Sequence, residues 1–218
     1  MRNRVRSRDD GMSLIEVLVS MVVFSMAIGI AFTAVIIVMQ KSGDAQKSAA
    51  AIAELRLALA QIDRQVRSGN VLYSPENEVG SGCESRAGTN AGTCMRIYTQ
   101  SNGDHKCVQW QMFADTSAGE DIYILRTRSW ALDWQMTGAV EPWSVVARDL
   151  YLDVDDTSVQ LPFLLEGAAT VYSDRMLRVH LQAWDARRGV PMAVDSAITG
   201  RNTSYGYDQG QCTQVPPA

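Results

Sequence analysis

The sequence lacks the residue patterns that most catalytic and metal-binding sites require. It has only two histidines, His105 and His180, and no Cys-x-x-Cys pair, so the closely spaced ligands of a zinc site are missing. It also has no Gly-x-Ser-x-Gly elbow, no Walker phosphate loop and no His-Glu-x-x-His motif. We therefore expect a protein that is not an enzyme and that holds no cofactor.

Positive charge is scarce beyond the first residues. The 218-residue chain has a formal net charge of −4, and nothing after the N-terminus is strongly basic. A nucleic-acid-binding domain normally carries a basic patch that neutralises phosphates. The composition predicts no nucleic-acid partner beyond a weak DNA contact by a small local patch.

Cysteine is absent from the first 82 residues, which excludes a lipoprotein with a modified N-terminal cysteine. The four cysteines are Cys83, Cys94, Cys107 and Cys212. An even number beyond a membrane-type segment favours two disulfides formed outside the cytoplasm, with four buried free thiols as the alternative. Four cysteines allow three pairings, and the sequence does not choose among them. We favour Cys83–Cys94 and Cys107–Cys212.

What the chain has in abundance is a long apolar run near its start. Val17 to Met39 is free of charge, and at ~1.5 Å per helical residue such a run crosses the hydrocarbon core of a bilayer. It is too long for the apolar core of a secretory signal peptide. Basic residues precede it (Arg2, Arg4, Arg6, Arg8), so this end is predicted to stay in the cytoplasm and the rest of the chain to lie outside it.

Glu16 stands at the edge of this apolar run. An ionised carboxylate at the end of a membrane helix is costly unless it is paired, which makes Glu16 a functional candidate. The alternative is a residue that merely reaches back to the polar membrane surface.

The residues around Glu16 form a pattern, Gly11-Met12-Ser13-Leu14-Ile15-Glu16. It resembles the prepilin peptidase site of type IV pilins and type II secretion pseudopilins, in which Glu is the fifth residue after the cleaved bond. The usual first residue of the processed chain is Phe, and here it is Met12. The resemblance implies cleavage between Gly11 and Met12, N-methylation of Met12, and pairing of Glu16 with the N-terminal amine of a neighbouring subunit.

The resemblance also implies a function. Three short segments are similar to PilW-type minor pilins and GspJ-type pseudopilins: Asp63–Ser68, Cys107–Trp110 and Leu161–Phe163. A minor subunit of this kind would initiate or cap a filament that serves adhesion, motility, DNA uptake (competence) or secretion. Its partners would be other pilin subunits, the prepilin peptidase, the membrane assembly platform and the lipid bilayer. The competing hypothesis is a single-pass, membrane-anchored extracytoplasmic enzyme or ligand-binding domain that keeps its leader.

The residue pattern predicts an α+β architecture, and the resemblance implies that it is pilin-like, with four parts. They are a leader (1–11), a transmembrane helix (12–40), an amphipathic continuation of that helix (41–69) and an antiparallel β head (70–218). The continuation carries an apolar stripe at steps of three and four residues, Ile52, Leu55, Leu59, Ile62 and Val66, and Ser68-Gly69-Asn70 ends it.

The head is predicted as an antiparallel meander. Residues 71–94 read as a Gly- and Ser-rich loop, and 199–218 as an irregular tail held by Cys212. Alternating patterns, with an Asn-Gly hairpin signal at Asn102-Gly103, predict strands over Met95–Thr99, Lys106–Phe113, Ile122–Trp130, Trp143–Leu152 and Met176–Trp184.

Two features of the head suggest ligands weakly. Asp153, Asp155 and Asp156 form an acidic cluster that is a calcium candidate, but Ser158 stands where an EF-hand loop needs Gly. A solvated acidic turn is the simpler interpretation. The five tryptophans, Trp110, Trp130, Trp134, Trp143 and Trp184, suggest carbohydrate stacking, although core packing and subunit contacts explain them more simply.

Overall fold

The computed structural model describes residues 13–78, 80, 82–86, 88–100, 103–117, 122–166, 175–185, 190–200 and 210–217, without the side chains of Trp184 and Asp185. Gly11 and Met12, the predicted cleavage site, lie outside these residues. The chain divides into two compact units, residues 1–46 and 47–218, each of which is described by itself.

One helix, α1 (Leu14–Ser68), extends from the first unit into the second. In the second unit it is amphipathic as predicted. Leu55, Ala58, Ile62 and Val66 are fully buried, Leu59 is partly buried against the same core, and Arg56, Leu57, Ala60 and Arg64 are exposed. The helix ends where Gly69 approaches a strand closely. A methyl group at Gly69 would lie 2.7 Å from Cγ2 of Ile97, so only glycine fits there.

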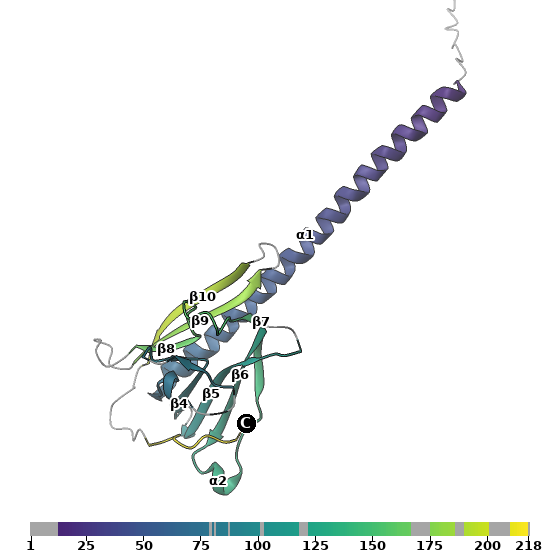
Figure 1. Cartoon of the computed structure of the whole chain (residues 1–218). Coiled ribbons are helices and arrows are strands. Elements are labelled where there is room, and N and C mark those ends of the chain that lie inside the picture. The colour runs from purple at the N-terminus through teal and green to yellow at the C-terminus, as the bar shows by residue number, and fades with distance from the viewer. Residues whose placement is uncertain are drawn as a thin grey trace, which may run out of the picture. The chain divides into compact units, whose positions relative to one another are not determined.

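The described part of the second unit contains one antiparallel sheet of ten strands (Figure 1). Its order is β1-β4-β5-β6-β7-β9-β8-β3-β2, and β10 pairs with β9. The strands are β1 (Gly69–Leu72), β2 (Ser85–Arg86), β3 (Ala91–Gly92), β4 (Cys94–Thr99), β5 (Lys106–Ala114), β6 (Ile122–Ala131), β7 (Ser144–Tyr151), β8 (Phe163–Glu166), β9 (Met176–Asp185) and β10 (Val190–Thr199). Two short helices complete the elements, η1 (Pro75–Asn77) and α2 (Trp134–Thr137).

The α+β fold with a long helix packed against an antiparallel sheet is confirmed, and so are all five predicted strands, within one or two residues at their ends. Two predictions were wrong. Residues 71–94 are not simply a loop, since they contain part of β1, then η1, β2 and β3. The meander holds for β4 to β7, but β9 follows β7 in space and β8 lies beyond it. Strands β8 and β10 were not predicted.

The two faces of the central strands have different chemistry, because side chains alternate between faces along a strand. Val108, Trp110 and Met112 of β5 belong to the main apolar core, together with the buried stripe of α1. Cys107, on the other face of β5, packs with Trp130 and Cys212 in a second, smaller cluster. The sheet therefore separates an apolar core on the α1 side from a mixed layer on its far face.

Candidate membrane and assembly segment

The first stretch of α1 is apolar on every side. Its large hydrophobic side chains from Leu14 to Met39 are all exposed, and an 18-residue window has a mean hydropathy of 2.7 with none of its residues buried. The helix is long and apolar enough to cross a membrane. A soluble helix normally has a polar side, so this stretch requires an apolar environment that the rest of the described chain does not supply.

Glu16 is the acidic residue of the first turn of α1, and it is exposed. Backbone N–H groups of Glu16 and Val17 donate to the Ser13 carbonyl, at 3.0 and 3.2 Å, and close this first turn. A carboxylate near a helix N-terminus is stabilised by the helix dipole. Within the described part of the chain, the Glu16 carboxylate has no hydrogen-bond or ion-pair partner, so it is available to a group from outside that part.

The polar side chains in this stretch are satisfied within the helix. The hydroxyls of Ser20 and Ser25 each donate to the carbonyl four residues earlier, at 2.7 Å, and Thr33 does the same at 2.9 Å. These residues therefore need no water, and Glu16 is left as the strongly polar group of the apolar stretch. The geometry suits a helix that is buried in lipid or among other helices, with one charged group near its end.

The head is closed by two disulfides, Cys83–Cys94 and Cys107–Cys212. This is the pairing that we favoured from the sequence, and the structure contains no free cysteine. The first closes a short loop, with a sequence separation of 11, and the second joins β5 to the C-terminal segment over a separation of 105. Disulfides of this kind fit an oxidising compartment.

Arginines on the far face of the sheet hold the C-terminal segment, a role that sequence reasoning missed. Arg96, Gln109 and Arg128 stand side by side on β4, β5 and β6. The Arg128 guanidinium donates to the carbonyls of Pro216 and Pro217, both at 2.8 Å. Burial lowers the pKa of Arg128, with a smaller contribution from the neighbouring charge of Arg126. The placement of Arg126 and Arg128 two residues apart, and so on one face of a predicted strand, was visible in the sequence, but the segment that covers that face was not.

Arg96 is the centre of a buried network on the same face. Its Nε lies 2.8 Å from both carboxylate oxygens of Glu78, and its Nη1 donates to the carbonyl of Cys212. Its guanidinium lies 4.9 Å from the ring centre of Tyr73, whose hydroxyl donates to the carbonyl of Gln211. Burial raises the pKa of Glu78, and the adjacent Arg96 partly opposes that effect. The network joins the 73–78 segment to the C-terminal segment.

The tryptophans divide between core and surface. Trp110 and Trp130 are buried on opposite faces of the sheet, and the indole N–H of Trp110 donates to Oε1 of Gln65 on α1, at 2.5 Å. Trp134 and Trp143 are partly buried. The side chain of Trp184 lies outside the described residues.

The acidic cluster forms a turn. Oδ1 of Asp153 accepts the backbone N–H groups of Asp155 and Asp156, both at 3.1 Å. Hydrogen bonds from Ser158 lower the pKa of Asp156, and Arg86 donates to the carbonyl of the same residue. The described residues contain no group of three or more His, Cys, Asp or Glu side chains placed to hold a metal. Calcium binding here stays a prediction.

Comparison with known proteins finds one match. Residues 6–32 match the model of the prokaryotic N-terminal methylation motif. No curated protein and no solved structure matches the chain. The motif supports a processed, type IV pilin-like subunit, and families with this motif are typically structural. Together with the apolar helix, it fits a membrane-anchored pilin.

Proposed function

We propose that this chain is a minor pilin or pseudopilin, a structural subunit that is cleaved after Gly11 and then built into a type IV pilus or a type II secretion-like filament. The observation that carries the proposal is the exposed apolar stretch of α1, which the match to the N-terminal methylation motif over residues 6–32 overlaps. Cleavage ahead of that stretch leaves the helix in the membrane, whereas cleavage after it would release the head.

Before assembly, the subunit is anchored in the cytoplasmic membrane with its head outside the cytoplasm. Two observations support this orientation. The basic residues precede the apolar run, and both disulfides lie in the head. On assembly, the helix leaves the lipid and packs among the helices of other subunits, so its apolar surface is never exposed to water.

Glu16 sets the register of the incoming subunit. An unpaired carboxylate among apolar helices costs several kcal/mol, and pairing with the N-methylated amine of a neighbour removes most of that cost. Such a pair forms only when the two helices are aligned along the filament axis. The apolar side chains then supply lateral packing without selecting a position along the axis.

In the filament, the chain serves as a minor subunit that initiates or caps assembly. The three segments that are similar to PilW-type and GspJ-type subunits support this position. Its partners are other pilin subunits, the prepilin peptidase and the membrane assembly platform. Its task is assembly, not catalysis.

The first test is intact-mass and N-terminal analysis of the protein purified from the membranes of its own host. We expect a chain that begins at Met12 and carries one added methyl group, and a full-length chain when the prepilin peptidase is deleted. A chain that still begins at Met1 in cells with an active peptidase would favour the membrane-anchored domain that keeps its leader.

Two glycines of the segment provide a matched pair for the cleavage site. Gly11→Val should block trimming, because a branched side chain replaces the residue ahead of the cut bond. Gly29→Val should leave trimming unchanged, since a Cβ at Gly29 meets nothing within 4 Å. Equal trimming of the two variants would contradict the assigned site.

If Glu16 sets the register, a substitution there should impair assembly without affecting trimming. Glu16→Gln should be trimmed and methylated normally but should be nearly absent from sheared filaments, because the neutral amide cannot form an ion pair with the charged amine of a neighbour. Asp44→Asn changes the next acidic residue along α1 and should be incorporated normally. Normal incorporation of Glu16→Gln would exclude the register role.

A further inference from the structure

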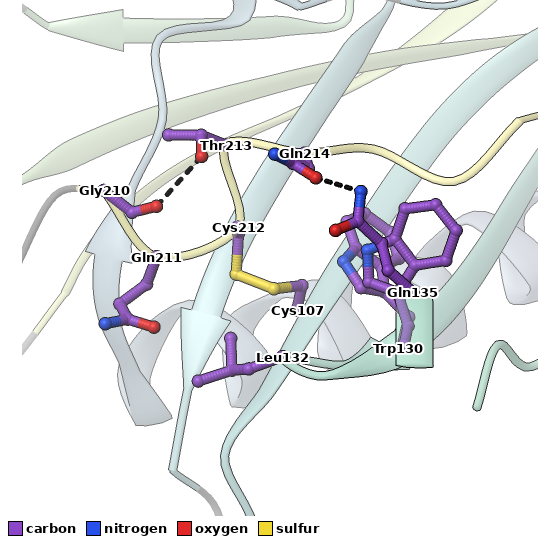
Figure 2. Close-up of a pocket in the computed structure, with 10 residues that line it drawn as sticks. Cys107, Trp130, Leu132, Gln135, Gly210, Gln211, Cys212, Thr213 and Gln214 are labelled. Carbon is purple, nitrogen blue, oxygen red and sulfur yellow. Dashed lines mark hydrogen bonds between the residues drawn. A yellow bond between two sulfur atoms is a disulfide. The ribbon is translucent and has the colours of Figure 1, made fainter. Parts of the chain in front are cut away.

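A cavity of about 260 Å³ opens beside the Cys107–Cys212 disulfide (Figure 2). Its wall comes from two places that are far apart in the sequence. Trp130, Trp134 and Gln135 come from the end of β6 and from α2, and Gln211, Thr213 and Gln214 come from the C-terminal segment.

The walls of this cavity are held in place from both sides. Trp130 is paired with Cys107 across β5 and β6, and Cys107 is bonded to Cys212. On the other side, the carbonyls of Gln211 and Cys212 accept hydrogen bonds from Tyr73 and Arg96. The C-terminal segment (210–217) is therefore held in place without any ligand. Binding of a ligand would need to order few side chains, so it would lose little conformational entropy.

Side chains from the two walls also meet directly. Nε2 of Gln135 donates to Oε1 of Gln214 across the cavity (Figure 2). Within the C-terminal wall, the Thr213 hydroxyl donates to the carbonyl of Gly210 at 3.0 Å. An amide group has two N–H donors and an oxygen with two lone pairs, so each glutamine keeps capacity for a further hydrogen bond. The cavity thus offers donors and acceptors at its rim.

The chemistry of the lining selects among ligand classes. Among the described residues, no charged side chain lines the cavity, which disfavours phosphates, nucleotides and carboxylates, since these need a cation or a cluster of donors. Trp134 is partly exposed and provides a flat apolar surface, whereas Trp130 is buried behind the wall. One indole face beside neutral groups that both donate and accept matches a molecule with one apolar face and a rim of hydroxyls.

The volume limits the size of that molecule. At about 260 Å³, the cavity lies just below the ~300–1,000 Å³ that is usual for pockets holding drug-sized ligands. It has room for one small ring and for no larger group. A longer ligand would place one ring in the cavity and extend out through its opening.

We propose that this cavity binds one ring of a neutral carbohydrate. The ring stacks on the Trp134 indole, and its hydroxyls exchange hydrogen bonds with Gln135, Gln211 and Gln214. The site belongs to the head alone, so it stands whether or not the chain assembles into a filament.

The test uses the full chain in phosphatidylcholine nanodiscs, because sugar-based detergents would compete for the site. The probes are the methyl glycosides of glucose, galactose, mannose and N-acetylglucosamine, with inorganic phosphate as the charged control. Saturation-transfer NMR and tryptophan fluorescence report binding. We expect at least one glycoside to bind saturably with a Kd on the order of 1 mM, and phosphate not to bind.

Variants locate the site. Trp134→Ala should weaken binding of that glycoside about tenfold or more, and Trp134→Phe should restore part of it, since a smaller aromatic face remains. Met136→Ala is the matched control. Met136 belongs to the same helical turn, is 86% exposed and does not line the cavity, so its removal should leave the Kd unchanged.

A variant on the C-terminal wall tests whether the effect of Trp134→Ala comes from local unfolding of α2. Gln214→Ala changes an exposed side chain of the tail segment and should weaken binding severalfold. The proposal is overturned if no glycoside of the panel binds saturably up to roughly 50 mM, some fifty times the expected Kd. It is also overturned if Trp134→Ala and Gln214→Ala both bind as tightly as the unchanged protein.

Discussion

The two units of this chain differ in how their apolar side chains are covered. In residues 47–218, α1 keeps its apolar residues on one stripe and buries them against the sheet, so Leu55 and Ile62 have no exposed surface. From Leu14 to Met39, the same helix is apolar on all sides and its large hydrophobic side chains are all exposed. The head obtains its stability from contacts within the chain, whereas the N-terminal stretch depends on lipid or on other helices. Changes in the head should therefore alter folding, and changes in the first stretch should alter insertion and assembly.

The largest expected effect on the head comes from the disulfide that holds the tail segment. Replacing Cys107 and Cys212 by Ser removes a cross-link over a sequence separation of 105, and a loop of ~100 residues corresponds to about 4.7 kcal/mol of unfolding free energy. The same change at Cys83 and Cys94 opens a much shorter loop and should cost less, about 3 kcal/mol. Urea unfolding followed by tryptophan fluorescence measures both. If either pair of substitutions lowers membrane insertion of the apolar stretch Leu14–Met39, the two units do not behave independently as we propose.

The buried stripe of α1 gives the next effect. Leu55→Ala should lower the free energy of unfolding by about 2–5 kcal/mol, because it leaves a cavity in the main core. Leu57→Ala is the matched control on the same helix. Leu57 is 63% exposed, so its truncation should change stability by less than about 0.5 kcal/mol. Equal destabilisation by the two variants would show that the helix is not docked on the sheet by this face.

A charge placed on each stretch sharpens the contrast. Ile30 is 73% exposed, which is comparable to Leu57, but it lies in the apolar run. Ile30→Lys should reduce membrane integration by about 2.5–3.5 kcal/mol, the cost of a lysine near the middle of a membrane helix. Leu57→Lys should have almost no effect on integration or on stability. The fraction that resists alkaline carbonate extraction measures integration, and full integration of Ile30→Lys would contradict the membrane assignment.

The smallest expected effect is a pH dependence that belongs to the head only. Burial raises the pKa of Glu78 in the folded state, so the folded protein holds this proton more tightly than the unfolded chain does. The contribution of Glu78 therefore favours the folded state fully below its unfolded pKa of about 4.3, and it is lost as the pH rises through the folded pKa. Glu78→Gln should flatten this part of the stability profile as the pH rises from about 4. Urea unfolding at a series of pH values tests it, and an unchanged profile would show that Glu78 does not carry the dependence.

The parts of the fold that could be predicted are those with a long local pattern. The stripe of α1 and the alternation along β4, β5, β6, β7 and β9 appear within single segments, and each segment is long enough to show its period. Strands β2 and β3 have two residues each and exist only through their pairing with each other and with β8. No period can be read from two residues, so these strands were taken for loop.

The same distinction applies to the candidate sites. Glu16 could be recognised because an acidic residue next to an uncharged run is a local signal. The roles of Arg96 and Arg128 could not, since their partners in the tail segment are far along the chain. Arg128 contacts Pro216 across 88 residues, and Arg96 contacts Cys212 across 116. In the sequence these arginines look like the solvent side of a half-buried sheet.

The sequence by itself determined the apolar helix that is able to cross a membrane, its basic flank and the N-terminal methylation motif, because hydrophobicity, charge and a short recognition pattern are properties of consecutive residues. Only the tertiary structure decided which residues cover the far face of the sheet. There, a disulfide and two arginines bring the C-terminal segment against Trp130 and create a cavity whose described lining residues include Trp134 and carry no charge. Such a cavity depends on contacts between distant segments, and their closure is a matter of the whole fold and not of any local stretch.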